Sequence, residues 1–111
     1  MRRDPAYLLD ILNSSVQAVE YLNESTLEEF LHETLRQDAV IRRIEIIGEA
    51  AGKISQEMIA AHPELPWREM KLMRNLLIHE YADVDIHEVW RTVKTDLPPL
   101  ITALTELISK I

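Results

Sequence analysis

Apolar residues recur at intervals of three and four positions along most of this chain, and that spacing predicts amphipathic helices. The pattern runs through residues 8–22, 27–54 and 86–111. Only two glycines and five prolines occur in 111 residues, so the chain has few of the turn residues on which β-hairpins depend. We therefore expect an all-α fold, with a single domain over residues 1–111 in which four or five helices form an up-down bundle.

Capping patterns predict where the first helices begin. Asp4 before Pro5 predicts the start of the first helix, with Asp4 as its N-cap. Ser25 followed by Glu28 predicts a capping box at the start of the second helix. A further break is expected at residues 37–38, where an aspartate can cap a new helix; a continuous but bent helix is the alternative.

Prolines divide the second half of the chain. A short helix is expected over residues 55–61, followed by a connector bounded by Pro63 and Pro66. The next helix should begin at Trp67, because proline is favoured in the first turn, and it should last until about residue 79.

Glycines and prolines inside the helical stretches predict close packing and a kink. Gly48 and Gly52 lie one turn apart, and such a pair predicts a flat patch that another helix can approach closely. The last helix should follow a cap near Asp85. Pro98–Pro99 should kink or restart it, with Asp96 as the new cap.

The formal net charge is −7, which opposes non-specific attraction to nucleic acid. A local basic site remains compatible with this charge, because seven lysines and arginines fall between residues 36 and 74. They are Arg36, Arg42, Arg43, Lys53, Arg68, Lys71 and Arg74.

The chain contains no cysteine, which excludes disulfides and thiolate metal sites and favours a reducing compartment. The N-terminus has no signal-peptide pattern, and no apolar run approaches the roughly 18 residues of a transmembrane helix. We expect a soluble, cytoplasmic protein with no membrane contact. His32, His62 and His87 lack the spacing of metal ligands, so no metal site is expected.

The stretch RNLLIHEY, residues 74–81, concentrates three reactive groups. Arg74 supplies a fork of donors for a phosphate, His79 transfers protons near neutral pH, and Tyr81 hydrogen-bonds or stacks on a base. Together they suit attack of an RNA 2′-hydroxyl on its neighbouring phosphate, which needs no metal. The alternative is that they are ordinary surface and cap groups at a helix end.

A regular helix does not gather all three side chains. Arg74 and Tyr81 would lie within about 20° of each other around the helix, whereas His79 would point about 140° away from Arg74. Either the helix ends near His79, or a second copy of the chain supplies part of the site.

The spacing of Arg74, His79 and Tyr81 is an RX4HXY motif, and it resembles that of the HEPN superfamily, in particular its HepT-like toxins. The segment QDAVIRRIEIIGEAAGKIS resembles the central helix of that family. The segment LPWREMKLMRNLLIHEYADVDIHEVWRTVKTDLPPL resembles its motif helix, the following link and its last helix.

This resemblance implies a HEPN-like bundle that dimerises through its motif helices and acts as a metal-independent endoribonuclease toxin. It implies that Arg74 binds phosphate, that His79 is the general acid or base, and that Asn75 supports the site. It also implies that a minimal nucleotidyltransferase antitoxin transfers AMP to Tyr81. ATP is then the donor used by that partner, and this chain needs no cofactor.

The chain departs from the family pattern at Leu76 and Glu80, where relatives often carry small or basic residues. Glu80 places a carboxylate inside the motif, which weakens the expectation of strong nuclease activity. Two other functions therefore stay open. One is a non-cleaving helical module that binds nucleotide or a nucleotidyltransferase partner. The other is a structural helical dimer whose motif serves only its own packing.

Overall fold

Helices make up all the regular secondary structure of residues 3–75 and 84–111, which are the residues that the computed structural model describes. This confirms the predicted all-α class. The elements are α1 (Asp4–Leu22), α2 (Leu27–Leu31), α3 (Thr34–Ala51), α4 (Gln56–Ala61), α5 (Trp67–Leu72), α7 (Ile86–Arg91), the π-helical turn η1 (Thr92–Asp96) and α8 (Leu97–Lys110).

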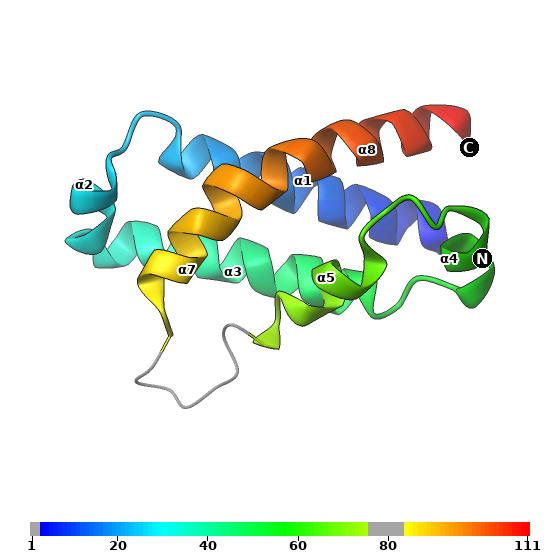
Figure 1. Ribbon diagram of the computed structural model, residues 1–111, viewed down its shortest axis with the longest axis horizontal. Helices are drawn as coiled ribbons and strands as arrows, with labels where there is room; N and C mark the ends of the chain where they lie inside the picture. Colours follow the sequence, from blue (N-terminus) through cyan, green and yellow to red (C-terminus); the bar gives the residue numbers. More distant parts are fainter. Residues whose placement is uncertain (1–2, 76–83) are drawn as a thin grey trace.

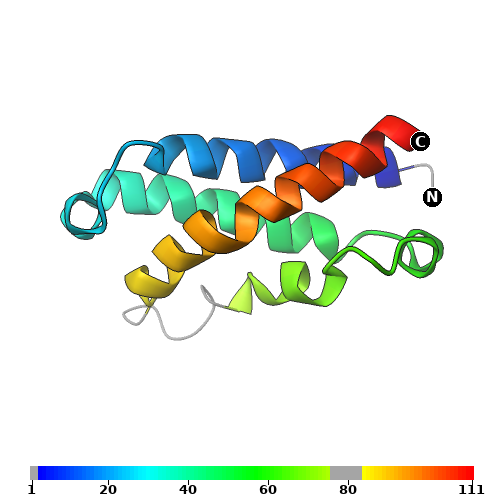
Figure 2. The ribbon, with the colours of Figure 1, turned by 45° about the horizontal axis from the view of Figure 1, so that its top comes forward.

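The helices form two layers. The long helices α1 and α3 lie side by side, and the continuous stretch α7–η1–α8 crosses them diagonally (Figures 1 and 2). The short helix α5 packs on α3 in the same layer as α7. The described residues measure 41 × 29 × 19 Å, and the shortest dimension is about two helix diameters.

The core lies where α1, α3 and α8 meet, and it is built from the apolar faces that the spacing predicts. Its members are inaccessible to solvent, so the hydrophobic effect holds the two layers together. Fully buried side chains of these three helices include Leu8, Ile11, Leu22, Val40, Ile44, Ile47, Leu97 and Leu104.

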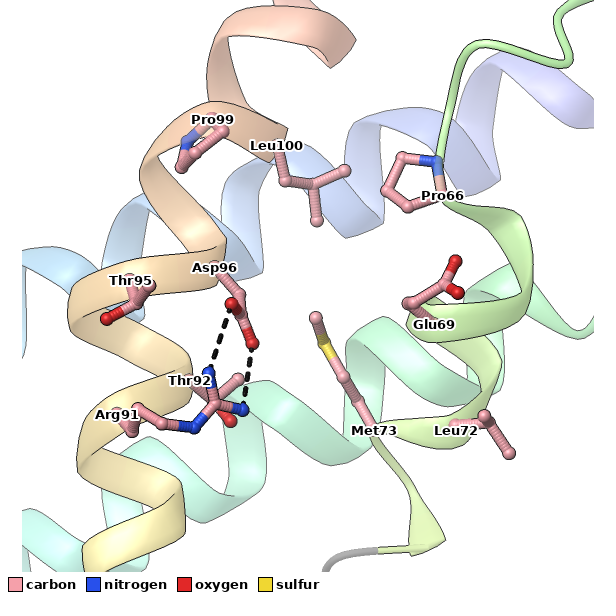
Figure 3. Close-up of a pocket in the computed structure, with 10 residues that line it drawn as sticks. All are labelled: Pro66, Glu69, Leu72, Met73, Arg91, Thr92, Thr95, Asp96, Pro99 and Leu100. Atoms are coloured by element: carbon pink, nitrogen blue, oxygen red, sulfur yellow. Dashed lines mark hydrogen bonds and ion pairs between the residues drawn. The ribbon is translucent and has the colours of Figure 1, made fainter.

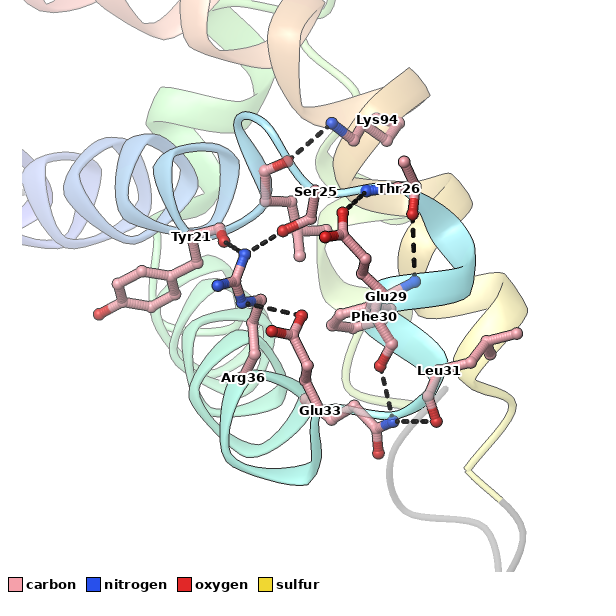
Figure 4. A network of polar contacts seen from close by, with 11 residues as sticks. Tyr21, Ser25, Thr26, Glu29, Phe30, Leu31, Glu33, Arg36 and Lys94 are labelled. Carbon is pink, nitrogen blue, oxygen red and sulfur yellow. Dashed lines mark hydrogen bonds and ion pairs between the residues drawn. The ribbon is translucent and has the colours of Figure 1, made fainter.

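The capping box at the start of α2 lies one residue later than predicted. The hydroxyl of Thr26 accepts a hydrogen bond from the backbone N–H of Glu29 at 3.1 Å, and the Glu29 carboxylate accepts one from the Thr26 N–H at 2.8 Å (Figure 4). Ser25 is not the cap, because its hydroxyl accepts a hydrogen bond from the guanidinium of Arg36 instead.

The predicted break at residues 37–38 is wrong, because α2 ends at Leu31 and α3 already begins at Thr34. Gln37 lies inside α3 and explains the earlier break. Its side-chain amide donates to the backbone oxygens of Phe30 and Leu31, at 2.9 and 3.2 Å (Figure 4). Both carbonyls stand at the end of α2, and the Phe30 oxygen also accepts from the backbone N–H of Glu33 at 3.3 Å, so Gln37 adds to the bonds that stabilise this break.

The start of the last helix is as predicted, since the Asp85 carboxylate accepts hydrogen bonds from the N–H groups of His87 and Glu88. Asp96 is the N-cap residue of α8, as predicted, and Pro98–Pro99 stand in the first turn of that helix, but the Asp96 side chain makes no capping hydrogen bond. The restart is instead a π-helical turn, in which the N–H of Leu97 bonds to the oxygen of Thr92, five residues back.

The predicted N-cap role of Asp4 is wrong, because its side chain binds Ser55 instead. The structure places Asp4 inside the first turn of α1, after an N-cap residue that has no side-chain capping bond. The Asp4 carboxylate is buried and accepts two hydrogen bonds from Ser55, from the backbone N–H at 3.0 Å and from the hydroxyl at 2.6 Å. Ser55 is the N-cap of α4, so this contact joins the start of α1 to the start of α4.

Candidate functional site

Helix α5 leads the chain into the motif, and its own packing is firm. The indole of Trp67 is buried and donates to the backbone oxygen of His62 at 2.8 Å. Met70 is fully buried and Met73 nearly so. Helix α5 ends at Leu72, a turn follows at residues 73–74, and the predicted helix end near residue 79 lies outside the described residues.

Arg74 lies in the turn that follows α5. The direction of its side chain therefore cannot be calculated from the 100° rotation per residue of a regular helix. Arg74 and Asn75 are both exposed to solvent. The other motif residues, His79 and Tyr81 together with Leu76 and Glu80, lie outside the described residues. The convergence of Arg74 with His79 and Tyr81 therefore stays a prediction.

The turn at residues 73–74, called the Arg74 turn below, packs against Gly48 of α3. A Cβ atom added at Gly48 would lie 3.0 Å from the backbone nitrogen of Arg74 and 3.1 Å from its Cβ, and closer still to its Cγ. The close approach predicted at the glycine pair is thus confirmed for Gly48. At Gly52 it is not found, because an added Cβ there would meet only carbonyl oxygens of α3 itself, at 3.5 and 3.6 Å.

A groove of about 430 Å³ opens beside the motif, between α5 and the α7–η1–α8 stretch (Figure 3). Its lining is mainly apolar, and Met73, the neighbour of Arg74, points into it. The lining residues are Pro66, Glu69, Leu72, Met73, Arg91, Thr92, Thr95, Asp96, Pro99 and Leu100.

The charges of this groove do not suit a phosphate. The Arg91 guanidinium is held by two carboxylates, by Glu88 at 2.6 Å and by Asp96 at 3.3 Å. The hydrogen bond from Glu88 and the charge of Asp96 raise the pKa of Arg91 above its ordinary value. Glu69 adds a further carboxylate on the opposite wall. A phosphate in the groove would therefore meet more negative than positive charge, which leaves Arg74 as the predicted phosphate ligand.

Sequence reasoning missed this groove for an identifiable reason. Arg91 and Asp96 are five residues apart, and a regular α-helix does not place residues at that spacing on one face. The π-helical turn brings them together. The only available signal was Pro98–Pro99, which predicted an irregularity without its form.

The seven basic residues counted in the sequence do not form one patch. Arg36 bonds to the backbone oxygen of Tyr21, far along the molecule from α5 (Figures 1 and 4). Arg42 pairs with two glutamates of α3, Arg43 bonds to Gln17, and Lys53 lies over the Tyr7 ring. The remaining three belong to α5 and the turn after it and are exposed: Arg68, Lys71 and Arg74.

Within residues 3–75 and 84–111, no three histidines or acidic residues are grouped so that they could hold a metal ion. No helix in the described part of the chain combines the length and apolar character needed to span a membrane.

Comparison with known proteins identifies the family. A family model described as "Ribonuclease HepT-like" matches residues 11–107, which include α3, α5, most of α8 and the whole motif. The chain belongs to the HepT-like ribonuclease family. No solved structure shows significant similarity to it.

Several archaeal and bacterial proteins are similar to this chain over most of their length. "Probable ribonuclease HepT" of Thermococcus cleftensis is 47% identical over 94 residues, which cover 85% of this chain and 86% of that protein. A "Putative RNase" of Methanocaldococcus jannaschii is 39% identical over 95 residues, covering 86% and 87%. A "Putative RNase" of Caldanaerobacter subterraneus is 32% identical over 110 residues, covering 99% and 98%.

Proposed function

We propose that this chain is a metal-independent endoribonuclease of the HEPN type and the toxin of a toxin–antitoxin pair. The observation that carries the proposal is the HepT-like match over residues 11–107, since it contains the complete RX4HXY motif. The names of the relatives, a ribonuclease and two RNases, support the same class of activity.

Arg74 and His79 are the catalytic residues of this proposal. The Arg74 fork binds the two non-bridging oxygens of the scissile phosphate and stabilises the charge that develops there. A neutral His79 imidazole accepts the proton of the 2′-hydroxyl, and the 2′-oxygen attacks phosphorus. The bond to the 5′-oxygen breaks, and that oxygen takes a proton from a protonated imidazole. The products are a 2′,3′-cyclic phosphate and a 5′-hydroxyl.

A homodimer supplies the two imidazoles that this reaction uses. With the motif segments meeting across a two-fold axis, one His79 acts as base and His79 of the partner subunit as acid. The exposure of Arg74 and Asn75 supports a site that is open to a polymeric substrate. Asn75 has a supporting role through its side-chain amide.

Tyr81 is the proposed control point. A minimal nucleotidyltransferase antitoxin transfers AMP from ATP to its phenol, so that ATP serves the partner and this chain has no cofactor. Each AMP group adds bulk and a negative charge seven residues from Arg74, and this blocks RNA by steric exclusion and repulsion.

The direct test is RNA cleavage in the presence of EDTA. We expect the parent protein to cleave single-stranded RNA and to leave 2′,3′-cyclic phosphate ends. His79→Ala should lower the rate by about 10²–10⁴-fold, as removal of a general acid or base does. His32→Ala is the matched control, because His32 is exposed at the end of α2, and it should cleave like the parent.

A different outcome would contradict each part of the proposal. Intact RNA both with EDTA and with added Mg²⁺ would contradict ribonuclease activity. Cleavage only with Mg²⁺ would contradict metal independence. Equal rates for the parent and His79→Ala would remove His79 from the mechanism.

The net charge of −7 and the carboxylates of the groove favour one second candidate, a helical module that binds a nucleotidyltransferase partner without cleaving RNA. Partner binding that persists in His79→Ala, with no RNA cleavage by the parent, would support this module over the nuclease.

A further inference from the structure

We propose that Gly48 is the positioning residue for Arg74: its missing side chain lets the Arg74 turn lie directly on α3, and this contact sets where the guanidinium reaches. The inference rests on the proposed function, in which Arg74 binds the scissile phosphate.

Glycine at position 48 lowers the stability of α3. It lies inside α3 and is buried, and glycine in a helix interior is less favourable than alanine. Backbone conformation does not explain the choice, because none of the described residues has a positive φ. The reason is space, since the backbone nitrogen of Arg74 lies 3.0 Å from where a Cβ would stand.

The Arg74 turn, and not α3, would yield to a larger residue at position 48. Ile44, Ile47 and Ala51, which flank Gly48 on α3, are fully buried in the core, so a shift of α3 would disturb the packing of the whole domain. Arg74 lies at the surface after α5 has ended. An added methyl group therefore displaces the Arg74 backbone and its side chain outward.

Gly52 provides the matched comparison. It stands one turn further along the same stretch, as the C-cap of α3, and an added Cβ meets only ordinary contacts there. Its φ of −66° suits alanine as well as glycine. Gly52→Ala should therefore leave Arg74 where it is.

The experiment compares Gly48→Ala, Gly52→Ala, Arg74→Ala and the double variant Gly48→Ala/Arg74→Ala. Cleavage of single-stranded RNA is measured as kcat/KM in EDTA, and thermal unfolding is followed by circular dichroism. We expect Gly48→Ala to lower kcat/KM by about 10²-fold, the size of loss that a displacement of about 1 Å causes in a positioned group. Gly52→Ala should match the parent.

The double variant separates positioning from general damage to the fold. If Gly48 acts through Arg74, Gly48→Ala lowers kcat/KM in the parent but has no further effect once Arg74 is alanine. Truncation of Arg74 also removes the Cγ atom from the contact, so Gly48→Ala should lower the unfolding temperature less in the Arg74→Ala background.

Parent-like kcat/KM in a folded Gly48→Ala variant would overturn the proposal, and so would equal loss of activity in both backgrounds. If Gly48→Ala does not fold, the double variant decides: recovery of folding supports the contact, and failure to recover overturns it. A parent protein that cuts no RNA would contradict the proposed function, while the unfolding temperatures would still test the contact.

Discussion

Asp4 provides a stability prediction whose size can be worked out from the structure. Its carboxylate is 2% exposed and receives both hydrogen bonds of Ser55, one from the backbone and one from the hydroxyl. Asp4→Ala leaves these two donors without their carboxylate partner. The Ser55 hydroxyl also accepts a hydrogen bond from Met58 and is therefore fixed in place.

Two hydrogen bonds to a charged group, at about 1.5 kcal/mol each for a site close to the surface, contribute about 3 kcal/mol. For a domain of this length, that loss corresponds to a fall of roughly 13 °C in the unfolding temperature. Asp10→Ala removes an exposed carboxylate from the same helix and should change stability by less than about 0.5 kcal/mol.

The same contact predicts a dependence on pH. Burial raises the pKa of Asp4, the hydrogen bonds from Ser55 lower it, and the net result is a pKa below the ordinary value of an aspartate. A carboxylate whose pKa is lowered in the folded state adds stability above its unfolded pKa, near 3.9, and loses that contribution as the pH falls through the folded value. The difference in the free energy of unfolding between the parent and Asp4→Ala should therefore be greatest near pH 7 and decrease below about pH 4.

The assay is urea and thermal denaturation of the parent, Asp4→Ala and Asp10→Ala, followed by circular dichroism between about pH 2 and pH 7. Other carboxylates, including Glu29, are common to the parent and Asp4→Ala and cancel in the comparison. The reasoning is refuted if Asp4→Ala unfolds within a degree or two of the parent at pH 7. A difference that grows on acidification would refute it as well.

Three further substitutions test the packing and the caps. Leu104→Ala removes a fully buried side chain and should lower the free energy of unfolding by about 2–5 kcal/mol, whereas Leu35→Ala, at a side chain that is 85% exposed, should change it by less than about 0.5 kcal/mol in urea titrations. Thr26→Ala removes the cap of α2 and should destabilise by about 1 kcal/mol, a loss that the neighbouring exposed Glu28→Ala should not reproduce. Trp67→Phe keeps a ring at the start of α5 but loses its N–H donor, so it should cost about 1 kcal/mol; an unchanged urea midpoint would show that this hydrogen bond is unimportant.

Signals that act over a few residues predicted two of the helix starts. The helix expected over residues 55–61 and the one expected after a cap near Asp85 are both found, with Ser55 and Asp85 as their N-caps, because a cap needs only an oxygen acceptor beside the first N–H groups of its own helix. The capping box of α2 was displaced because two overlapping pairs fit the same pattern. Arg36 of α3 decides between them by taking the hydroxyl of Ser25.

At the candidate site, too, the sequence predicted the local motif but not the contacts between distant residues. The RX4HXY motif and its flanking segments predicted the family that the HepT-like match confirms, because the identity and spacing of residues carry that information. The contact between Gly48 and Arg74 spans 26 positions of the chain. The glycine pair predicted a close approach, but not which glycine makes it or which residue it receives.

The sequence by itself determined that this chain is helical and which faces of its helices are buried, because a repeat of three and four residues leaves one apolar stripe on each helix. Only the tertiary structure decided the partners of Asp4, Gly48 and Asp96. Asp4 meets a serine 51 residues away, Gly48 receives the turn after α5, and Asp96 turns to Arg91 across a widened helical turn. Such contacts depend on how the helices are placed against one another, and no local pattern encodes that placement.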